Sequence, residues 1–254
     1  MDSAGNHKYN LFRILFYPLT RRLSLLRTLY FNLHYFPLKT ALKFPVFIHT
    51  HVRLKKVKGS VELSFRPLKP GAVHIGQTNY GFQTNNDHTI WEQLGGTVIF
   101  GKRVMIGKGT FLSIGSDAVL KFGDNIAVGG NDKLICRNSI EIGSDTIISW
   151  DVQIIDTNFH PTINTVSNTI NRVDKPIVIG HHNWLCFGSV ILKGSVTPNH
   201  CIVSTNTTIR SDFSRSGENI ILDDHPEAQV TVRNVRFDER TMDDPLVRRK
   251  NSSG

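Results

Sequence analysis

A single stretch, IGHHNWLCFGSVILKGSVTPNHCIVSTNTTI, residues 179–209, repeats one hydrophobic position every six residues. The members of this series are Ile179, Leu185, Ile191, Thr197, Val203 and Ile209, and all except Thr197 are large aliphatic residues. Small or compact residues follow the first five members at a distance of four residues: Asn183, Ser189, Ser195, Cys201 and Thr207. Self-similarity at a fixed period is the sequence signature of a repeat architecture.

A period of six fits β-strands and does not fit a helix. At about 100° per residue, successive members of the series would rotate around a helix by about 600°. On a strand, six is a multiple of the two-residue side-chain period, so every member faces the same side. Three strands joined by three tight corners make a rung of about eighteen residues, and stacked rungs form a solenoid.

The same period occurs earlier in the chain. Four further series are Phe100, Ile106 and Leu112; Ile114 and Leu120; Phe122, Val128, Leu134 and Ile140; and Ile142, Ile148 and Ile154. Shifts of two residues separate these series, and we interpret them as rungs that are slightly longer at one corner. Gly143 and Gly180 each follow an aliphatic residue, where glycine permits a tight corner. We predict an all-β solenoid, a parallel β-helix with clear repeats over 98–209, because a sandwich of short strands would space its turns irregularly.

Segments of a different character flank the repeats. Residues 1–45 combine large apolar residues with several arginines, and the part from about Thr20 to Leu33 fits an amphipathic helix. Such a helix either packs on the body of the protein or lies on an anionic membrane surface. We expect the β-helix domain over 46–230 and a short charged C-terminal tail over 231–254.

Composition limits the partners and the compartment. Lys and Arg number 30 against 21 Asp and Glu, and the formal charge of +9 favours anionic partners. The three cysteines form no CxxC pair, which argues for a reducing compartment. The sequence shows no signal-peptide layout and no run of about 18 apolar residues, so we expect a cytoplasmic protein that could touch the inner face of a membrane. The repeats carry no basic stripe interleaved with aromatics, so no nucleic-acid partner is expected.

Two motifs in the repeat region resemble a known enzyme family. ISWDVQIIDTNFHP, residues 148–161, is similar to the active-site stretch of maltose and galactoside acetyltransferases and of bacterial polysaccharide O-acetyltransferases. PIVIGHHNWLCFGSVILKGSV, residues 176–196, resembles the stretch in which a Trp follows an Asn. The maltose and galactoside acetyltransferases and the bacterial polysaccharide O-acetyltransferases are hexapeptide-repeat acyltransferases. The resemblance implies a left-handed parallel β-helix, a homotrimer, acetyl-CoA as co-substrate, and a sugar or polysaccharide hydroxyl as acceptor.

The resemblance also assigns the catalytic chemistry. His160 matches the family's His, which projects into a cleft between neighbouring subunits, and it is the predicted general base because imidazole titrates near neutral pH. Asp156 would orient that imidazole, and an aspartate that caps a turn is the alternative interpretation. Asn158 and Arg172 lie in the expected active-site loop, 156–175, and are candidates for binding the acceptor.

The coenzyme site is expected where the repeat resumes after this loop. Trp184 offers a flat apolar surface for the pantetheine chain, and an outward cover on the coil is the alternative. The backbone N–H of Phe187 or of Gly188 would stabilise the oxyanion. Thr205 occupies the position of the family's second coenzyme contact.

The sequence departs from the family near the end of the coil. The family usually closes with Gly-x-Pro-Ala-Lys, which helps to hold the coenzyme phosphates, whereas residues 223–230 read DDHPEAQV. This stretch has no basic residue at the matching position. Arg210 and Arg215 are the two candidates to replace it.

Other functions are compatible with the same fold. N-acetylation of an amino sugar would use the same chemistry, and a non-catalytic scaffold would not need His160. A γ-type carbonic anhydrase needs three His ligands around zinc. The nearest set is His160, His181 and His182, but two adjacent corner residues would point in different directions. We therefore expect O-acetyl transfer without a metal ion.

Overall fold

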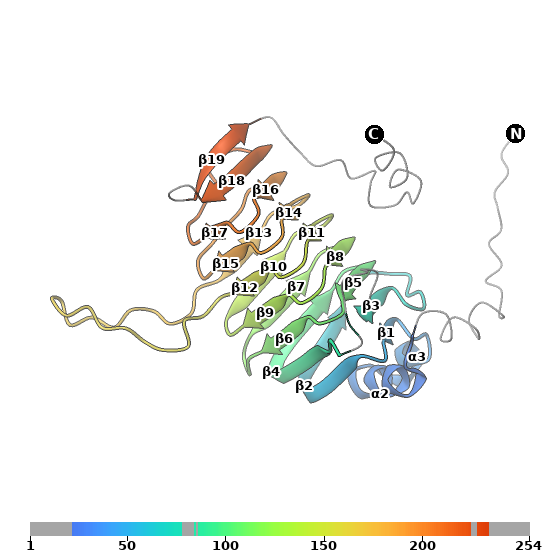
Figure 1. Cartoon of the computed structure of the whole chain (residues 1–254). Coiled ribbons are helices and arrows are strands. Elements are labelled where there is room, and N and C mark those ends of the chain that lie inside the picture. Colours follow the sequence, from blue (N-terminus) through green and yellow to red (C-terminus); the bar gives the residue numbers. More distant parts are fainter. Residues whose placement is uncertain (1–21, 78–83, 85, 225–227, 234–254) are drawn as a thin grey trace, which may run out of the picture.

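The structure is a computed structural model, and it describes residues 22–77, 84, 86–224 and 228–233. Short strands stack into a coil, with helices packed at one end (Figure 1). The helices are α2 (Leu25–Tyr35) and α3 (Leu38–Ala41). The strands are β1 (Val46–Ile48), β2 (Val52–Leu63), β3 (Val73–Gln77), β4 (Thr89–Phe100), β5 (Val104–Gly107), β6 (Phe111–Ile114), β7 (Val119–Phe122), β8 (Ile126–Val128), β9 (Lys133–Cys136), β10 (Ser139–Ile142), β11 (Ile147–Ile148), β12 (Gln153–Ile155), β13 (Ile177–Ile179), β14 (Trp184–Leu185), β15 (Val190–Leu192), β16 (Cys201–Val203), β17 (Thr208–Ile209), β18 (Ile220–Asp224) and β19 (Ala228–Arg233).

The strands form three faces of the coil. The first face contains β1, β3, β5, β8, β11, β14, β16 and β18, paired in that order. The second contains the first half of β4 and then β6, β9, β12, β15 and β17, and the third contains the second half of β4 with β7, β10 and β13. Strand β4 belongs to two faces because Ile90–Gln93 pairs with β6 while Thr97–Phe100 pairs with β7. These pairs are all parallel, which confirms the predicted parallel β-helix.

A glycine lets β4 turn the corner between the second and third faces. A Cβ atom on Gly96 would lie 2.2 Å from the carbonyl oxygen of Ala118 in the next rung. Any larger residue would push the two rungs apart at this point.

The six-residue series forms the core of the coil. Its members stack one above another on the first face in the order Ile106, Val128, Ile148, Leu185 and Val203. Each of these side chains is at most 3% exposed. Thr197, the polar member of the series, is buried too, and its Oγ1 accepts a hydrogen bond from Asn183 Nδ2 at 2.6 Å.

The rungs are wider near the start of the coil. Leu185 pairs with Val203, a step of 18 residues, whereas Ile106 pairs with Val128, a step of 22 residues. The sequence predicted that the extra residues lie at a corner, but this was wrong. They lengthen the strands instead, and each lengthened strand gains one more inward side chain. The additional inward side chains are Ile114, Phe122 and Cys136, all of them buried.

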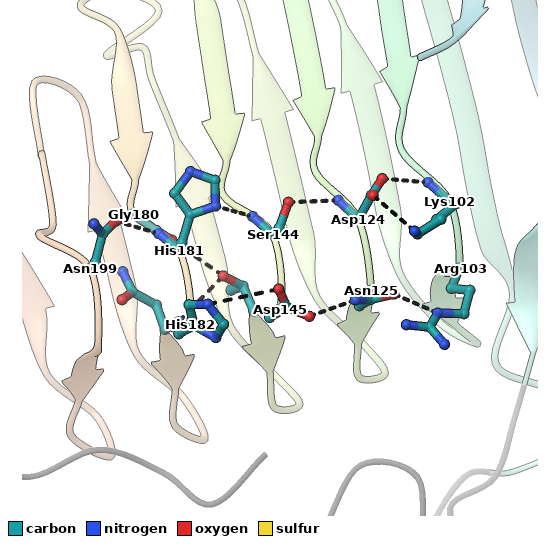
Figure 2. A network of polar contacts seen from close by, with 12 residues as sticks. Lys102, Arg103, Asp124, Asn125, Ser144, Asp145, Gly180, His181, His182 and Asn199 are labelled. Carbon is teal, nitrogen blue, oxygen red and sulfur yellow. Dashed lines mark hydrogen bonds and ion pairs between the residues drawn. The ribbon is translucent and has the colours of Figure 1, made fainter. Parts of the chain in front are cut away.

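Left-handed backbone conformation turns the chain where the third face leads into the first, the third corner. Arg103, Asn125, Asp145, His182 and His200 occupy this position in successive rungs, with φ between 52° and 59°. Arg103 Nε donates to Asn125 Oδ1 at 2.5 Å, and Asn125 Nδ2 donates to Asp145 Oδ1 at 2.6 Å (Figure 2). The His182 ring stacks on the His200 ring, with centroids 4.6 Å apart. Asn and Asp adopt positive φ more readily than other non-glycine residues, which suits them to this column.

A second chain of hydrogen bonds runs along the same corner (Figure 2). Asp124 Oδ1 accepts from the Lys102 amide at 2.9 Å, and Ser144 Oγ accepts from the Asp124 amide at 3.0 Å. His181 Nδ1 accepts from the Ser144 amide at 3.0 Å. A side chain of each rung therefore binds the backbone of the preceding one, and His181 is part of this scaffold.

Helix α2 begins later than the sequence predicts. Ser24 caps the helix, since its Oγ accepts from the Arg27 amide at 3.4 Å, and the helix starts at Leu25. The predicted start near Thr20 lies outside the described residues. No helix in the described part of the chain is long and apolar enough to cross a membrane.

One face of α2 packs on the first rungs of the coil. Phe31 is fully buried, and its ring centroid lies 5.3 Å from that of Trp91 inside the coil. Asn32 Nδ2 donates to the Val46 carbonyl at 2.7 Å. Packing on the body of the protein, one of the two interpretations of the N-terminal segment, is therefore confirmed for α2.

The other end of the coil ends in an antiparallel pair. Strand β19 runs antiparallel to β18 and extends to Arg233. The predicted tail, 231–254, therefore begins inside a strand, and its remainder from 234 onward lies outside the described residues.

A carboxyl group is buried where the second face begins. Asp132 is fully buried, and its Oδ1 accepts from the Val152 amide at 2.8 Å. Its Oδ2 has no hydrogen-bond partner among the described residues. Burial raises the pKa of Asp132 well above its usual value, and the hydrogen bond from Val152 opposes this rise only in part.

The raised pKa of Asp132 makes stability depend on pH in a defined direction. The folded state binds the proton of Asp132 more tightly than the unfolded state does. The resulting contribution to stability is fully present below the ordinary aspartate pKa of about 3.9. It is lost as the pH rises through the raised pKa of the folded state. Asp132→Asn keeps an acceptor for Val152 and cannot ionise. We expect the unfolding temperature of the variant, relative to wild type, to increase as the pH is raised above the ordinary aspartate pKa of about 3.9, measured by thermal denaturation. A difference that stays constant with pH would contradict this account.

Candidate active site

The predicted loop between β12 and β13 is a two-stranded arm. Residues 157–174, which we call the arm, leave the coil where the second face meets the third, the second corner, and extend far from the coil (Figure 1). Thr157 pairs antiparallel with Asp174, and Ile163 pairs antiparallel with Ile170. The sequence predicted a loop here, and the structure gives that loop a hairpin pairing.

The root of the arm is fixed to the coil. Lys193 Nζ, from the rung above, donates to the carbonyls of Arg172 at 2.6 Å and Val173 at 3.0 Å. The Lys175 amide donates to the Asp156 carbonyl at 3.0 Å. Side chains at the root therefore keep a constant position relative to the rungs.

His160 lies at this root with its side chain exposed. The His160 amide donates to the Asn158 carbonyl at 2.7 Å, and Phe159, at φ +60°, makes the turn between them. The Phe159 amide donates to Thr157 Oγ1 at 2.9 Å, which fixes the turn from the other side. Within the described residues the imidazole of His160 makes no hydrogen bond, so both ring nitrogens are open to a ligand.

Asp156 is buried beneath the arm rather than beside the imidazole. Its Oδ1 accepts from the Arg137 amide at 2.7 Å and its Oδ2 accepts from the Asn138 amide at 2.8 Å. Burial raises the pKa of Asp156, and these two hydrogen bonds oppose the rise. Both oxygens thus bind the preceding rung, which favours the turn-capping interpretation over an orienting contact with His160.

The acceptor candidates flank His160 on the two strands of the arm. Asn158 follows the outgoing strand, and its amide donates to the Val173 carbonyl at 3.1 Å. Arg172 directly precedes Val173 on the returning strand, and both Asn158 and Arg172 are exposed. The structure therefore brings these two predicted residues to opposite sides of the arm root.

The coenzyme candidates gather near a different edge, the first corner, where the first face meets the second. Trp184 is 38% exposed on the outside of β14, and its Nε1 donates to Ser149 Oγ at 3.0 Å. Phe187 is also 38% exposed, with its ring centroid 6.0 Å from that of Trp150. Two exposed aromatic rings of one rung, with the half-buried Trp150 of the preceding rung, give this corner an apolar surface.

The two candidate oxyanion donors differ in the structure. The Gly188 amide donates to the Trp150 carbonyl at 3.1 Å, so it is already engaged. The Phe187 amide makes no hydrogen bond within the described part of the chain, although its carbonyl accepts from the Asn206 amide at 2.9 Å. Phe187 is therefore the better candidate of the pair.

The remaining two coenzyme candidates lie on separate corners. Thr205 is exposed at the first corner, one rung beyond Phe187. Arg210 is exposed just after β17, at the second corner, which the arm also leaves. The second face thus separates the His160 edge of a single chain from the Phe187 edge.

Two residues that the sequence did not single out contribute to these edges. Trp150 pairs with Phe187, and its place inside the first recognised motif could have indicated it. Lys193 holds the arm through backbone carbonyls, a contact that no sequence pattern indicates.

A hollow of about 300 Å³ lies at the third corner, away from both edges. Its acidic groups are already paired: Glu141 contacts Lys121 Nζ at 2.5 Å, and Glu218 accepts from Asn199 at 3.0 Å. No group of three or more His, Cys, Asp or Glu residues in the described part of the chain could hold a metal ion. His160 also lies on a different corner from His181 and His182, so these three do not converge within one chain.

Comparisons with known proteins find a similarity in sequence to one protein and similarities in fold to solved structures. No family model matches the chain. It is 27% identical over 128 residues to WbbJ of Escherichia coli K12, a protein named for O-acetyl transfer in lipopolysaccharide biosynthesis. The match covers 46% of this chain, and the chain spans 64% of the length of that relative.

A solved structure shows the same fold. The polysialic acid O-acetyltransferase OatWY superimposes with a TM-score of 0.55 and 22% identity, over 78% of this chain and 94% of OatWY. A hexapeptide-repeat acetyltransferase of Vibrio cholerae, complexed with acetyl coenzyme A, has a TM-score of 0.35 and 12% identity, over 82% of this chain and 83% of its own. The chain has a left-handed parallel β-helix fold, and the predicted resemblance to hexapeptide-repeat acetyltransferases is confirmed.

The position of Asp156 yields a test of its role. Removing its carboxylate leaves the amides of the half-buried Arg137 and Asn138 without these acceptors, so Asp156→Ala should lower the free energy of unfolding by about 2–4 kcal/mol. Chemical denaturation measures this loss. Asp117→Ala, which removes an exposed aspartate, is the matched control and should change stability by less than about 0.5 kcal/mol. Equal effects of the two substitutions would rule out the capping role.

Proposed function

We propose that this protein transfers an acetyl group from acetyl-CoA to a hydroxyl group of a sugar or surface-polysaccharide unit. The observation that carries the proposal is His160, an exposed imidazole without an internal hydrogen bond, at the root of an arm fixed to a β-helix that OatWY shares. The sequence similarity to WbbJ points to the same chemistry. N-acetylation of an amino sugar is the alternative within this class.

The residues divide the chemistry as follows. Acetyl-CoA, when bound as co-substrate, supplies a thioester carbonyl for the acceptor hydroxyl to attack. His160 takes the proton from that hydroxyl as the new C–O bond forms, and the resulting imidazolium can return it to the departing thiolate. In this proposal the Phe187 amide donates a hydrogen bond to the oxygen that becomes negative in the tetrahedral intermediate. The transfer is direct, so both substrates must be held together.

The first corner has the chemistry that a pantetheine chain requires. The exposed rings of Trp184 and Phe187 and the half-buried ring of Trp150 offer apolar contact, and the amide of Thr205 is a candidate for a hydrogen bond to the amides of the pantetheine chain. For the coenzyme phosphates, Arg210 remains the candidate cation. Part of the stretch that replaces the family's basic motif, residues 225–227, lies outside the described residues.

The separation of the two edges supports a site shared between copies of the chain. His160 and Phe187 lie on opposite sides of the second face, so a neighbouring copy would have to bring the partner edge to each arm. The arm also exposes large apolar side chains: Phe159, Ile163, Val166 and Ile170. A closed ring of three copies would bury them and form three equivalent sites.

A cytoplasmic location fits this proposal. Cys136, Cys186 and Cys201 are free thiols, as expected in a reducing compartment. The acceptor would then be modified on the cytoplasmic side, before export.

Removing the imidazole is the decisive test of the proposal. We expect His160→Ala to lower acceptor-dependent release of free CoA thiol by about 10²-fold or more, measured with a panel of sugar acceptors. The best acceptor also distinguishes hydroxyl from amino groups. His34→Ala, which removes an exposed histidine from α2 at the end of the coil, is the matched control and should retain activity. An active His160→Ala variant, or thiol release from neither protein, would refute the proposal.

Mixed assemblies test whether the site is shared. We expect His160→Ala and Trp184→Ala homo-oligomers to be impaired separately. If each site takes its imidazole from one chain and its aromatic edge from the next, coexpressed chains should recover roughly a quarter of the wild-type rate in a random mixture. Tags of different kinds on the two variants allow the mixed species to be purified. No recovery in assemblies that contain both chains would place the whole site within one copy.

A further inference from the structure

Helices α2 and α3 present an unusual surface to the solvent. Their outward side chains include six leucines, each at least 42% exposed, which we call the leucine face: Leu25, Leu26, Leu29, Leu33, Leu38 and Leu42. Leu26 is the most open of them, at 81%. A gathering of exposed large apolar side chains on neighbouring helices is a candidate contact with a partner or a membrane.

The orientation of α2 is the reverse of what its composition alone would favour. Polar Thr28 and Asn32 are buried with Phe31, while its leucines face outward. Hydrogen bonds enforce this choice, because Thr28 Oγ1 accepts from the Ile48 amide at 2.9 Å and Asn32 Nδ2 donates to the Val46 carbonyl at 2.7 Å. The face of α2 that docks inward thus combines two hydrogen-bonded polar side chains with Phe31, and its leucines are left facing outward.

Positive charge surrounds the leucine face. Residues 22–63 contain eight Lys and Arg residues but a single acidic residue, Glu62. Lys39 and Lys43 are exposed on and just after α3. Lys56 and Lys58 are exposed on β2, which α2 contacts through a 2.6 Å hydrogen bond between His34 Nε2 and the Val57 carbonyl. Residues 22–63 therefore carry a formal net charge of +7, part of it on exposed lysines near the leucine face.

We propose that the leucine face and its basic rim bind an anionic lipid bilayer. Leucines on a short amphipathic helix enter the boundary between headgroups and acyl chains, and each nearby lysine or arginine adds attraction to acidic headgroups. Docking of a second copy through the same surface would bring like charges together. A nucleic acid would gain little from exposed leucines, so the bilayer matches both halves of the surface.

The position of the surface leaves the proposed active site uncovered. Helices α2 and α3 pack at one end of the coil and β18 and β19 lie at the other, while the arm projects sideways between them (Figure 1). The coil would stand on the membrane by its first rungs. An acceptor attached to lipid could then reach the arm without passing through the coil.

Vesicle co-sedimentation of the full chain tests this inference. We expect the wild-type protein to pellet with phosphatidylcholine vesicles that contain about 30 mol% phosphatidylglycerol, and much less with phosphatidylcholine alone. The double substitution Leu26→Glu/Leu29→Glu should lower the partition coefficient by about tenfold or more. Lys56→Gln/Lys58→Gln should lower it several-fold, and about 0.5 M NaCl should weaken binding of the wild type.

The controls separate this inference from the proposed enzymatic activity and from self-association. Val119→Glu makes the same kind of change at an exposed site on β7 and should leave vesicle binding unchanged. Thiol release, measured without vesicles, should be the same for Leu26→Glu/Leu29→Glu as for wild type. Equal pelleting with both vesicle types, or unchanged pelleting of the leucine variant, would overturn the inference. Sedimentation velocity measures the oligomeric state. If the leucine variant changes the oligomeric state and not vesicle binding, the leucine face is a contact between copies and the inference is overturned.

Discussion

Parallel pairing between successive rungs is the interaction on which every other feature of this molecule depends. Each short strand satisfies its backbone groups only through the rungs above and below, and each inward aliphatic side chain is covered only by its equivalents in those rungs. Stability in such a solenoid comes from neighbour-to-neighbour contacts rather than from one central core. A rung can therefore be widened, as at Phe122, or interrupted, as at the arm, without disturbing the rungs farther along.

The corners carry the features that distinguish one rung from another. The third corner is a structural column, where the residues from Arg103 to His200 hold left-handed backbone and bind one another. The second corner bears the arm with His160, and the first bears the exposed rings of Trp184 and Phe187. In the proposed function the chemistry lies at these two corners, because the inward side chains of the flat faces are committed to stacking in the core.

The two ends of the coil must each be covered, because a terminal rung has an unpaired strand edge and an uncovered core. At the first end α2 covers Trp91 with Phe31, and at the last end β19 reverses direction and pairs with β18. The helical cap does more than close the coil. Because the buried face of α2 is formed by Thr28, Phe31 and Asn32, the leucines of this helix point outward and contribute to the leucine face.

The sequence by itself determined the period, and with it the class of fold, because six residues return a side chain to the same face of a strand. The sequence also indicated His160. This residue lies outside the six-residue series, so the repeat does not account for its presence. Only the tertiary structure decided that Asp156 binds the amides of Arg137 and Asn138, since those partners lie one rung away and a local motif cannot specify them. The outward direction of the leucines on α2 was likewise decided by hydrogen bonds to β1, because periodicity reveals that a helix has two faces but not which face the rest of the protein will bury.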